Sequence, residues 1–203
     1  MKNFSQILTE WVNAKKSHTV GELLNILDER SFAFVFLILM AFPALPLPTG
    51  GVVHALEVIV IILASQMLLG RQELWLPKGL QKKQLPKPIL KKMLPFLIKY
   101  IQLFEKISRA RGSSFIPQRW FRIQLAFFII IFTLFAFFAP PLSGVVSFPS
   151  LGVVIISIGI ILRDVLVVLI GYIIGIIGCG LVVLLGAGVL AAIQQALSSI
   201  MVY

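Results

Sequence analysis

The chain has 203 residues, of which 59% are hydrophobic and only 13% charged, and its formal net charge is +10. Soluble globular domains carry about 25% charged residues, so the composition excludes an ordinary soluble enzyme or binding domain. Three segments, residues 31–56, 123–162 and 165–203, contain no Asp, Glu, Lys or Arg. Because a spanning helix needs about 20 apolar residues, we predict an all-α, polytopic helical protein of the inner (plasma) membrane.

Residues 1–30 form a polar N-terminal segment. Charged residues such as Glu10 and Lys15 interrupt any apolar run that a cleaved signal peptide would require. Thr19 followed three residues later by Glu22 predicts a capping box at the start of a short helix. We expect this segment to be helical and to remain in the cytosol.

Residues 31–70 predict a first broken-helix hairpin. The apolar block 31–42 has 12 residues, which is too few to span a bilayer alone. It is followed at 43–51 by PALPLPTGG, which cannot continue a helix. A second apolar block, 52–69, then returns. Irregular backbone at membrane depth is tolerated only inside protein or beside water, so we expect a broken or re-entrant helix here.

Residues 71–120 form a basic segment that we expect to be cytosolic or interfacial. Thirteen Lys and Arg residues lie between Arg71 and Arg122, with only two acids among them. Such a bias favours the cytosolic side, and its membrane flanks favour lipid headgroups over nucleic acid. Residues 89–104 mix lysines with bulky apolar residues, which predicts an amphipathic helix lying flat on the membrane. The lysines expected to contact anionic headgroups are Lys82, Lys83, Lys87, Lys91, Lys92 and Lys99.

Residues 121–163 predict a second broken-helix hairpin. A 19-residue apolar block, 121–139, precedes a break that contains two prolines and a glycine. A shift of 93 residues aligns Pro48 with Pro141 and Gly51 with Gly144. This alignment predicts two internal repeats. The charges favour repeats that leave and return to the cytosolic side, and inverted repeats, which need an extra crossing or a re-entrant loop, stay open as the alternative. Paired Pro/Gly-broken segments in two halves are typical of a transporter's binding site.

Residues 164–203 form a glycine-rich C-terminal membrane segment. Its length fits two close-packed helices with a turn within 178–188, or one tilted span and a re-entrant piece. The clustering of Lys and Arg in the chain leads us to expect both termini in the cytosol. Gly171, Gly175, Gly178 and Val182 recur at helical spacing as a small-residue packing face. This face fits internal packing better than a homodimer, which stays open as the alternative.

His54 and Glu57 lie three residues apart just after the first break, where a carboxylate is costly in a membrane. One interpretation is proton or cation handling, and the other is an interfacial pair near the outer headgroups. Arg163 and Asp164 fit a charged turn at the cytosolic interface, or a partner for Glu57 or His54. The candidate ion or substrate site comprises Thr49, Gly50, Gly51, His54, Glu57, Ser143, Gly144, Arg163 and Asp164.

No catalytic motif is present in the sequence: there is no Walker loop, Gly-x-Ser-x-Gly, His-Glu-x-x-His or cysteine pair. Cys179 is the single cysteine, so an intrachain disulfide is excluded. We therefore expect no enzyme activity, no cofactor and no resident metal.

The order of several motifs resembles the ExoD exopolysaccharide-synthesis family of bacterial membrane proteins. The helix containing Gly21-Glu22-Leu23-Leu24 precedes the proline-rich break, and then come Gln66-Met67-Leu68-Leu69-Gly70-Arg71 and Trp75-Leu76-Pro77. Glu73-Leu74 and Glu57 depart from the pattern expected of the family. The resemblance implies a role in exopolysaccharide production and alkali tolerance, without an enzymatic motif.

Two functions fit these observations. The first is a small-solute or ion transporter whose site lies where the two breaks meet. The second is a non-transporting accessory protein that organises a polysaccharide assembly machine, with polysaccharide-assembly proteins as partners. A polar, hydrated cavity joining the breaks favours the first, and a dry core with a basic face favours the second.

Overall fold

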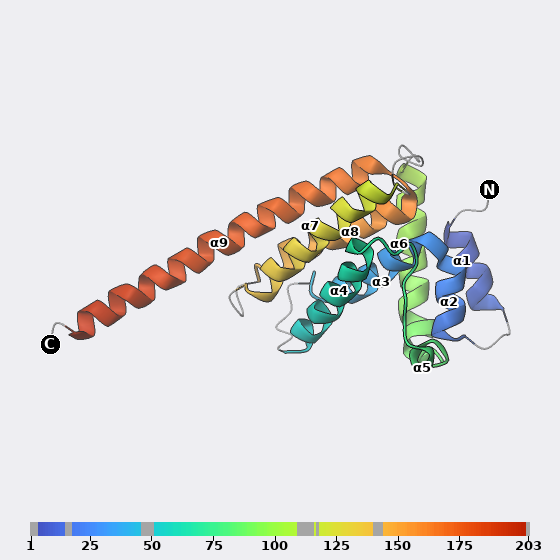
Figure 1. The fold of residues 1–203 in the computed structure, drawn as a ribbon, viewed down its shortest axis with the longest axis horizontal. Helices are drawn as coiled ribbons and strands as arrows, with labels where there is room; N and C mark the ends of the chain where they lie inside the picture. The colour runs from blue at the N-terminus through green and yellow to red at the C-terminus, as the bar shows by residue number, and fades with distance from the viewer. Residues whose placement is uncertain are drawn as a thin grey trace.

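The computed structural model describes residues 4–14, 18–45, 51–108, 116, 118–139 and 144–201, and these residues are predominantly helical. The elements in chain order are α1 (Phe4–Asn13), α2 (Val20–Leu27), the 3-10 turn Asp28–Arg30, α3 (Ser31–Ala41), α4 (Val52–Leu68), α5 (Lys78–Gln81), a π-helical turn (Ile89–Met93), α6 (Leu94–Ile107), α7 (Arg119–Phe137), α8 (Ser147–Leu162) and α9 (Val165–Met201). Figure 1 shows them as a helical group from which α9 projects far beyond its neighbours. The all-helical class predicted from the sequence is confirmed.

Two helical pairs, α3 with α4 and α7 with α8, make up the centre of the fold (Figure 1). Each helix packs on its own partner, and α3 also packs on α8 while α4 packs on α7. The starts of α3 and α7 lie with the ends of α4 and α8, at an end we call the base. The ends of α3 and α7 lie with the starts of α4 and α8, at an end we call the tip. Both pairs therefore point in the same direction.

Many buried positions of one pair recur in the other at the same 93-residue offset, although buried Phe34 corresponds to exposed Phe127. Glu57, Val60, Leu63, Ala64 and Met67 of α4 are buried, and so are their counterparts Ser150, Val153, Ile156, Ser157 and Ile160 of α8. In the first helix of each pair, the buried residues Phe32, Ala33, Phe36 and Met40 correspond to the buried residues Leu125, Ala126, Ile129 and Thr133. The offset that aligned the Pro/Gly breaks thus also aligns the inward faces of four helices.

Helix α9 packs on α8 at a distance that only glycine allows. A Cβ on Gly152 would lie 2.6 Å from the Cα of Gly175, and a Cβ on Gly171 would lie 2.7 Å from the backbone nitrogen of Ile156. A Cβ on Gly178 would lie 2.5 Å from the nitrogen of Pro149. The small-residue face predicted at Gly171, Gly175 and Gly178 therefore packs inside this chain.

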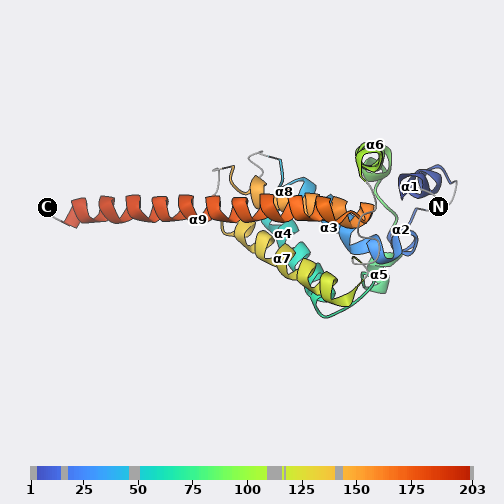
Figure 2. The same cartoon turned by 90° about the horizontal axis from the view of Figure 1, so that it is seen from above.

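The turn expected within 178–188 is wrong, because α9 is a single helix of 37 residues. At a rise of 1.5 Å per residue, it is about 55 Å long. Its glycines let α8 approach closely, and they do not interrupt the apolar helix. Figures 1 and 2 show its C-terminal end far from the base, at which the helix begins.

Two helices among the described residues are long and apolar enough to cross a membrane, namely Arg119–Phe137 and Val165–Gly188. Helices α4 and α8 are apolar but shorter, with 17 and 16 residues. Helix α3 has only 11 residues before its chain reaches the first break.

The N-terminal helices and α6 lie beside the base. The predicted capping box is confirmed: Thr19 Oγ1 accepts from the Glu22 amide, and the Thr19 amide donates to the Glu22 carboxylate. Helix α6 runs across the direction of α9, which Figure 2 shows by viewing α6 end-on and α9 along its side. Pro95 lacks the amide that would bond to the carbonyl four residues earlier, which accounts for the π-helical turn just before it.

We predict that Gly152→Ala destabilises the protein while Gly180→Ala does not. The added methyl group at 152 meets backbone at 2.6 Å, whereas nothing lies within 4 Å of a Cβ at 180. Overpacking costs about 1–3 kcal/mol, and alanine in an open helical position gains up to about 1 kcal/mol over glycine. Thermal unfolding in detergent should therefore shift in opposite directions for the two variants. Equal melting temperatures would contradict the close contact between α8 and α9.

Candidate functional site

A histidine–carboxylate pair lies at the tip, on the first two turns of α4. With the carboxyl group ionised, His54 Nδ1–H donates to Glu57 Oε2 at 2.9 Å. The Glu57 side chain is fully buried, whereas the His54 side chain is 45% exposed. The His54 ring also meets the Phe137 ring edge-on, with centroids 4.9 Å apart. The pair therefore connects a buried carboxyl group to the surface through one imidazole.

The second carboxyl oxygen of Glu57 makes the site unusual. Oε1 is buried and has no hydrogen-bond partner among the described residues. A buried acceptor without a donor costs about 1–3 kcal/mol, and more when it is charged. The energetic cost falls if Oε1 takes up a proton or if a small cation or donor group binds there.

Ser150 is the counterpart of Glu57, 93 residues later on α8. It is fully buried, and its Oγ likewise has no hydrogen-bond partner among the described residues. The same offset aligns His54 with Ser147, which is also buried. The sequence analysis did not select Ser147 and Ser150, although the offset that aligned Gly51 with Gly144 would have found them. Each helical pair therefore places polar side chains at the same depth behind its break.

Several predicted site residues cannot be assigned to this pair. Thr49, Gly50 and Ser143 lie outside the described residues. Gly51 is exposed and directly precedes α4. Gly144 has φ of 68° before α8, a left-handed conformation that glycine adopts without a Cβ clash.

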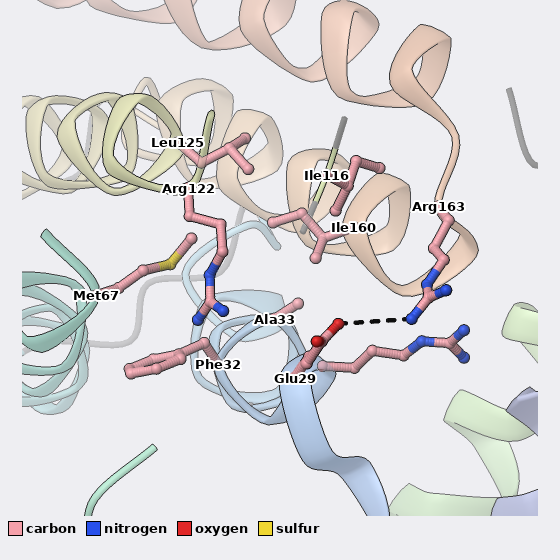
Figure 3. Close-up of a pocket in the computed structure, with 10 residues that line it drawn as sticks. Glu29, Phe32, Ala33, Met67, Ile116, Arg122, Leu125, Ile160 and Arg163 are labelled. Atoms are coloured by element: carbon pink, nitrogen blue, oxygen red, sulfur yellow. Dashed lines mark ion pairs between the residues drawn. The ribbon is translucent and has the colours of Figure 1, made fainter. Parts of the chain in front are cut away.

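Arg163 and Asp164 lie at the base, at the opposite end from His54 and Glu57. Arg163 Nη2 approaches Glu29 Oε2 at 3.5 Å (Figure 3), so its ion pair is with Glu29 and not with Glu57. Asp164 Oδ2 accepts from Ser108 Oγ at 2.7 Å, and Oδ1 accepts from the Leu166 amide at 3.1 Å. Asp164 thus caps the start of α9 and ties it to the end of α6.

We predict that Asp164→Ala lowers stability through loss of this cap. N-cap removal typically costs about 0.5–2 kcal/mol. Asp164→Asn keeps an oxygen that can accept from the Leu166 amide, so it is the matched control. Thermal unfolding should show a lower melting temperature for the alanine variant and a smaller change for asparagine. An unchanged melting temperature in Asp164→Ala would contradict the capping role.

The lysines predicted to contact headgroups form an exposed basic surface along α5, the π-helical turn and α6. Its members are Lys82, Lys83, Lys87, Lys91, Lys92 and Lys99, all exposed. Phe96, Tyr100 and Leu103 are exposed beside them, while Leu94, Leu97 and Ile101 are buried beneath. Lysines interleaved with exposed aromatic side chains are typical of a helix at a membrane interface.

Neither a catalytic nor a metal centre is assigned by this geometry. Within the described part of the chain, no three His, Cys, Asp or Glu side chains are grouped closely enough to hold a metal ion. The chemistry that the tip offers is proton exchange or coordination by a single carboxyl group with an imidazole beside it.

The described structure defines a helical protein with two helices able to cross a membrane and a buried carboxyl group at one end of its helical pairs. Residues 4–184 match the family described as "Exopolysaccharide synthesis, ExoD". The chain belongs to this family.

The chain is also similar in sequence to a cyanobacterial protein. The chain is 26% identical over 141 residues to the uncharacterized protein slr1875 of Synechocystis sp., a match that covers 70% of this chain and 66% of that protein. The match thus spans slightly less than two thirds of the relative's length. No solved structure matches this chain.

Proposed function

We propose that this ExoD-family protein supports exopolysaccharide synthesis from the inner membrane, by moving a proton, a small cation or a small solute through its helical group. The observation that carries the proposal is Glu57, a fully buried carboxylate with one oxygen paired to His54 and the other without a partner among the described residues. Intramembrane carboxylates are costly and usually serve proton or ion handling. Proton-coupled movement through this site would also account for the alkali tolerance that the family resemblance implies.

We also propose a multi-pass arrangement with the base in the cytosol. Arg30, Arg71, Arg122 and Arg163 lie at the ends of the central helices that make up the base, and the basic surface of α5 and α6 adjoins it. Both helical pairs return to the base, whereas α9 leaves it as one uninterrupted helix. A cytosolic C-terminus would require a turn in α9, so we now place the C-terminus on the opposite side from the N-terminus.

We further propose that the helical pairs are two parallel repeats related by an approximate two-fold axis. The support is the shared 93-residue offset of their buried faces and their reciprocal packing, with α3 on α8 and α4 on α7. In this arrangement the two Pro/Gly breaks, and the polar positions Glu57 and Ser150, share the tip. Paired breaks of this kind form the substrate sites of many transporters.

A second candidate function is a non-transporting scaffold for polysaccharide-assembly proteins. Like the first candidate, it involves no enzymatic activity. The observation that favours it is the dry interior below Glu57. Val60, Ala64, Leu125, Ala126 and Ile129 fill this interior and are all almost fully buried. A flux assay in proteoliposomes separates the two functions, because a scaffold moves no ion or solute.

We predict that Glu57→Gln abolishes function while the protein still folds. Glutamine keeps the shape of the side chain but can neither ionise nor bind a cation by charge. In a deletion strain, the variant should be present at wild-type level yet fail to restore polysaccharide output or growth at alkaline pH. Glu73→Gln, which removes an exposed carboxylate, is the matched control and should complement fully. Normal complementation by Glu57→Gln would sink the proposal that this site carries the function.

We predict that positions 85 and 198 lie on opposite sides of the membrane. Leu85→Cys and Ser198→Cys would each be made in a Cys179→Ala background and exposed to an impermeant maleimide in intact spheroplasts. Position 198 should react directly, and position 85 only after the membrane is opened. The proposed orientation fails if position 85 reacts in intact spheroplasts, and the external C-terminus fails if position 198 does not.

A further inference from the structure

A second polar site lies at the base, where the two helical pairs meet. Figure 3 shows the pocket, which has a volume of about 20 Å³, enough space for about one water molecule. Three of its lining pairs, Glu29 with Arg122, Phe32 with Leu125 and Met67 with Ile160, are separated by the same 93 residues. The pocket therefore lies between equivalent positions of the two pairs.

The lining of this pocket is strongly cationic. Arg30, Arg122 and Arg163 contribute guanidinium groups, and Glu29 is the one acidic side chain among the lining residues. The contact between Glu29 and Arg163 is a long 3.5 Å, and the Glu29 side chain is 42% exposed. Burial lowers the pKa of Arg30 and the positive charge of Arg163 lowers it further, while the negative charges of Glu105, Glu29 and Asp28 oppose this shift. Glu105 and Asp28 also act on Arg30 from outside the pocket lining, so it is the described lining itself that carries three guanidinium groups and one carboxylate.

Arg122 is the fixed member of the cluster. It is only 8% exposed, and its Nη2 donates to the carbonyl oxygens of Arg71, at 2.9 Å, and Gln72. These bonds orient the guanidinium plane, and among the described residues the Nη1 and Nε hydrogens have no acceptor. No carboxylate among the described residues lies within ion-pair distance of Arg122.

Arg163 occupies a position at which glycine would be less strained. It ends α8 with φ of 55°, and the Asp164 amide closes the turn on the carbonyl of Gly159 at 2.9 Å. This left-handed position commonly holds glycine because a Cβ is unfavourable there. The turn alone would favour glycine at this position. The presence of an arginine is therefore explained by its side chain, which points toward Glu29.

We propose that this pocket binds the phosphate group of an anionic membrane lipid, with Glu29 as an exchangeable counter-ion. Guanidinium groups bind phosphate oxygens through charge-assisted, often bidentate hydrogen bonds. In the orientation proposed above, on which this inference rests, the base lies at the headgroup level of the cytosolic leaflet. Basic pockets between helices at that level bind anionic headgroups. Because the free volume fits only about one water molecule, the exposed Glu29 side chain swings outward as the phosphate enters.

The test measures lipid binding to the purified full-length protein in neutral detergent by native mass spectrometry. Phosphatidic acid is the probe, phosphatidylcholine is the lipid without net charge, and inorganic phosphate is the soluble competitor. Arg163→Gly and Arg30→Gln should each weaken phosphatidic acid binding about tenfold, the size of one charge-assisted hydrogen bond. Glu29→Gln should strengthen it, because it removes the competing carboxylate. Lys106→Gln removes an exposed charge that does not line the pocket, and it should bind as the wild type does.

The outcomes separate this proposal from its rivals. Retained thermal stability of Arg163→Gly, whose backbone strain is relieved, shows that lost binding is not lost folding. Equal binding by the wild type and both arginine variants would overturn the pocket. Displacement of the lipid by low concentrations of inorganic phosphate would overturn the lipid as ligand. The measurement does not involve Glu57 or flux, so its failure and the failure of the proposed transport are distinguishable.

Discussion

Close approach of helix backbones is the constraint on which this fold depends. Apolar helices in a bilayer gain little from burying one another, because lipid chains are equally apolar, so van der Waals contact must hold them together. Helix α8 is central to this packing, since it meets α3, α7 and α9. Gly152 and Gly159 of α8 let backbone and side chains of α9 approach to distances that a methyl group would prevent. The position of α9, and with it the capped turn at Asp164, follows from this contact.

The same close packing makes the buried polar atoms informative. A tightly packed apolar interior offers few donors, so each unpartnered oxygen has a free-energy cost that the rest of the fold must offset. Thr133 and Ser157 avoid this cost by donating to carbonyls of their own helices. Glu57 Oε1 and Ser150 Oγ do not, and both lie on the buried faces of α4 and α8 near the tip. Packing alone would favour an alanine or a leucine at either position, which is why function is the better explanation of Glu57.

The sequence was most informative where local chemistry decides the structure. The capping box at Thr19 and the long apolar run of α7 follow from neighbouring residues, and the structure has both in place. The Pro/Gly breaks follow in the same way, since one described helix ends before each break and another begins after it. The turn predicted from the glycines of α9 is wrong, because glycine is common both in turns and in closely packed helices. Only the tertiary partner, α8, distinguishes these uses. Arg122 was missed for a related reason, since an arginine at the start of a span resembles an ordinary topological charge until its carbonyl partners are known.

The two polar sites share one geometric origin. The 93-residue offset relates Glu57 to Ser150 at the tip and Glu29 to Arg122 at the base, so each end of the paired helices presents two equivalent positions. In both cases one position carries a carboxylate and the other does not. At the base, both positions line one pocket, and the guanidinium group of Arg122 contributes to its largely cationic lining. At the tip, Glu57 is the ionisable member of its pair and Ser150 is not. Under the proposed repeat, the shared offset supplies the geometry, and the sequence differences between the halves supply the charge that a proton, cation or phosphate could use.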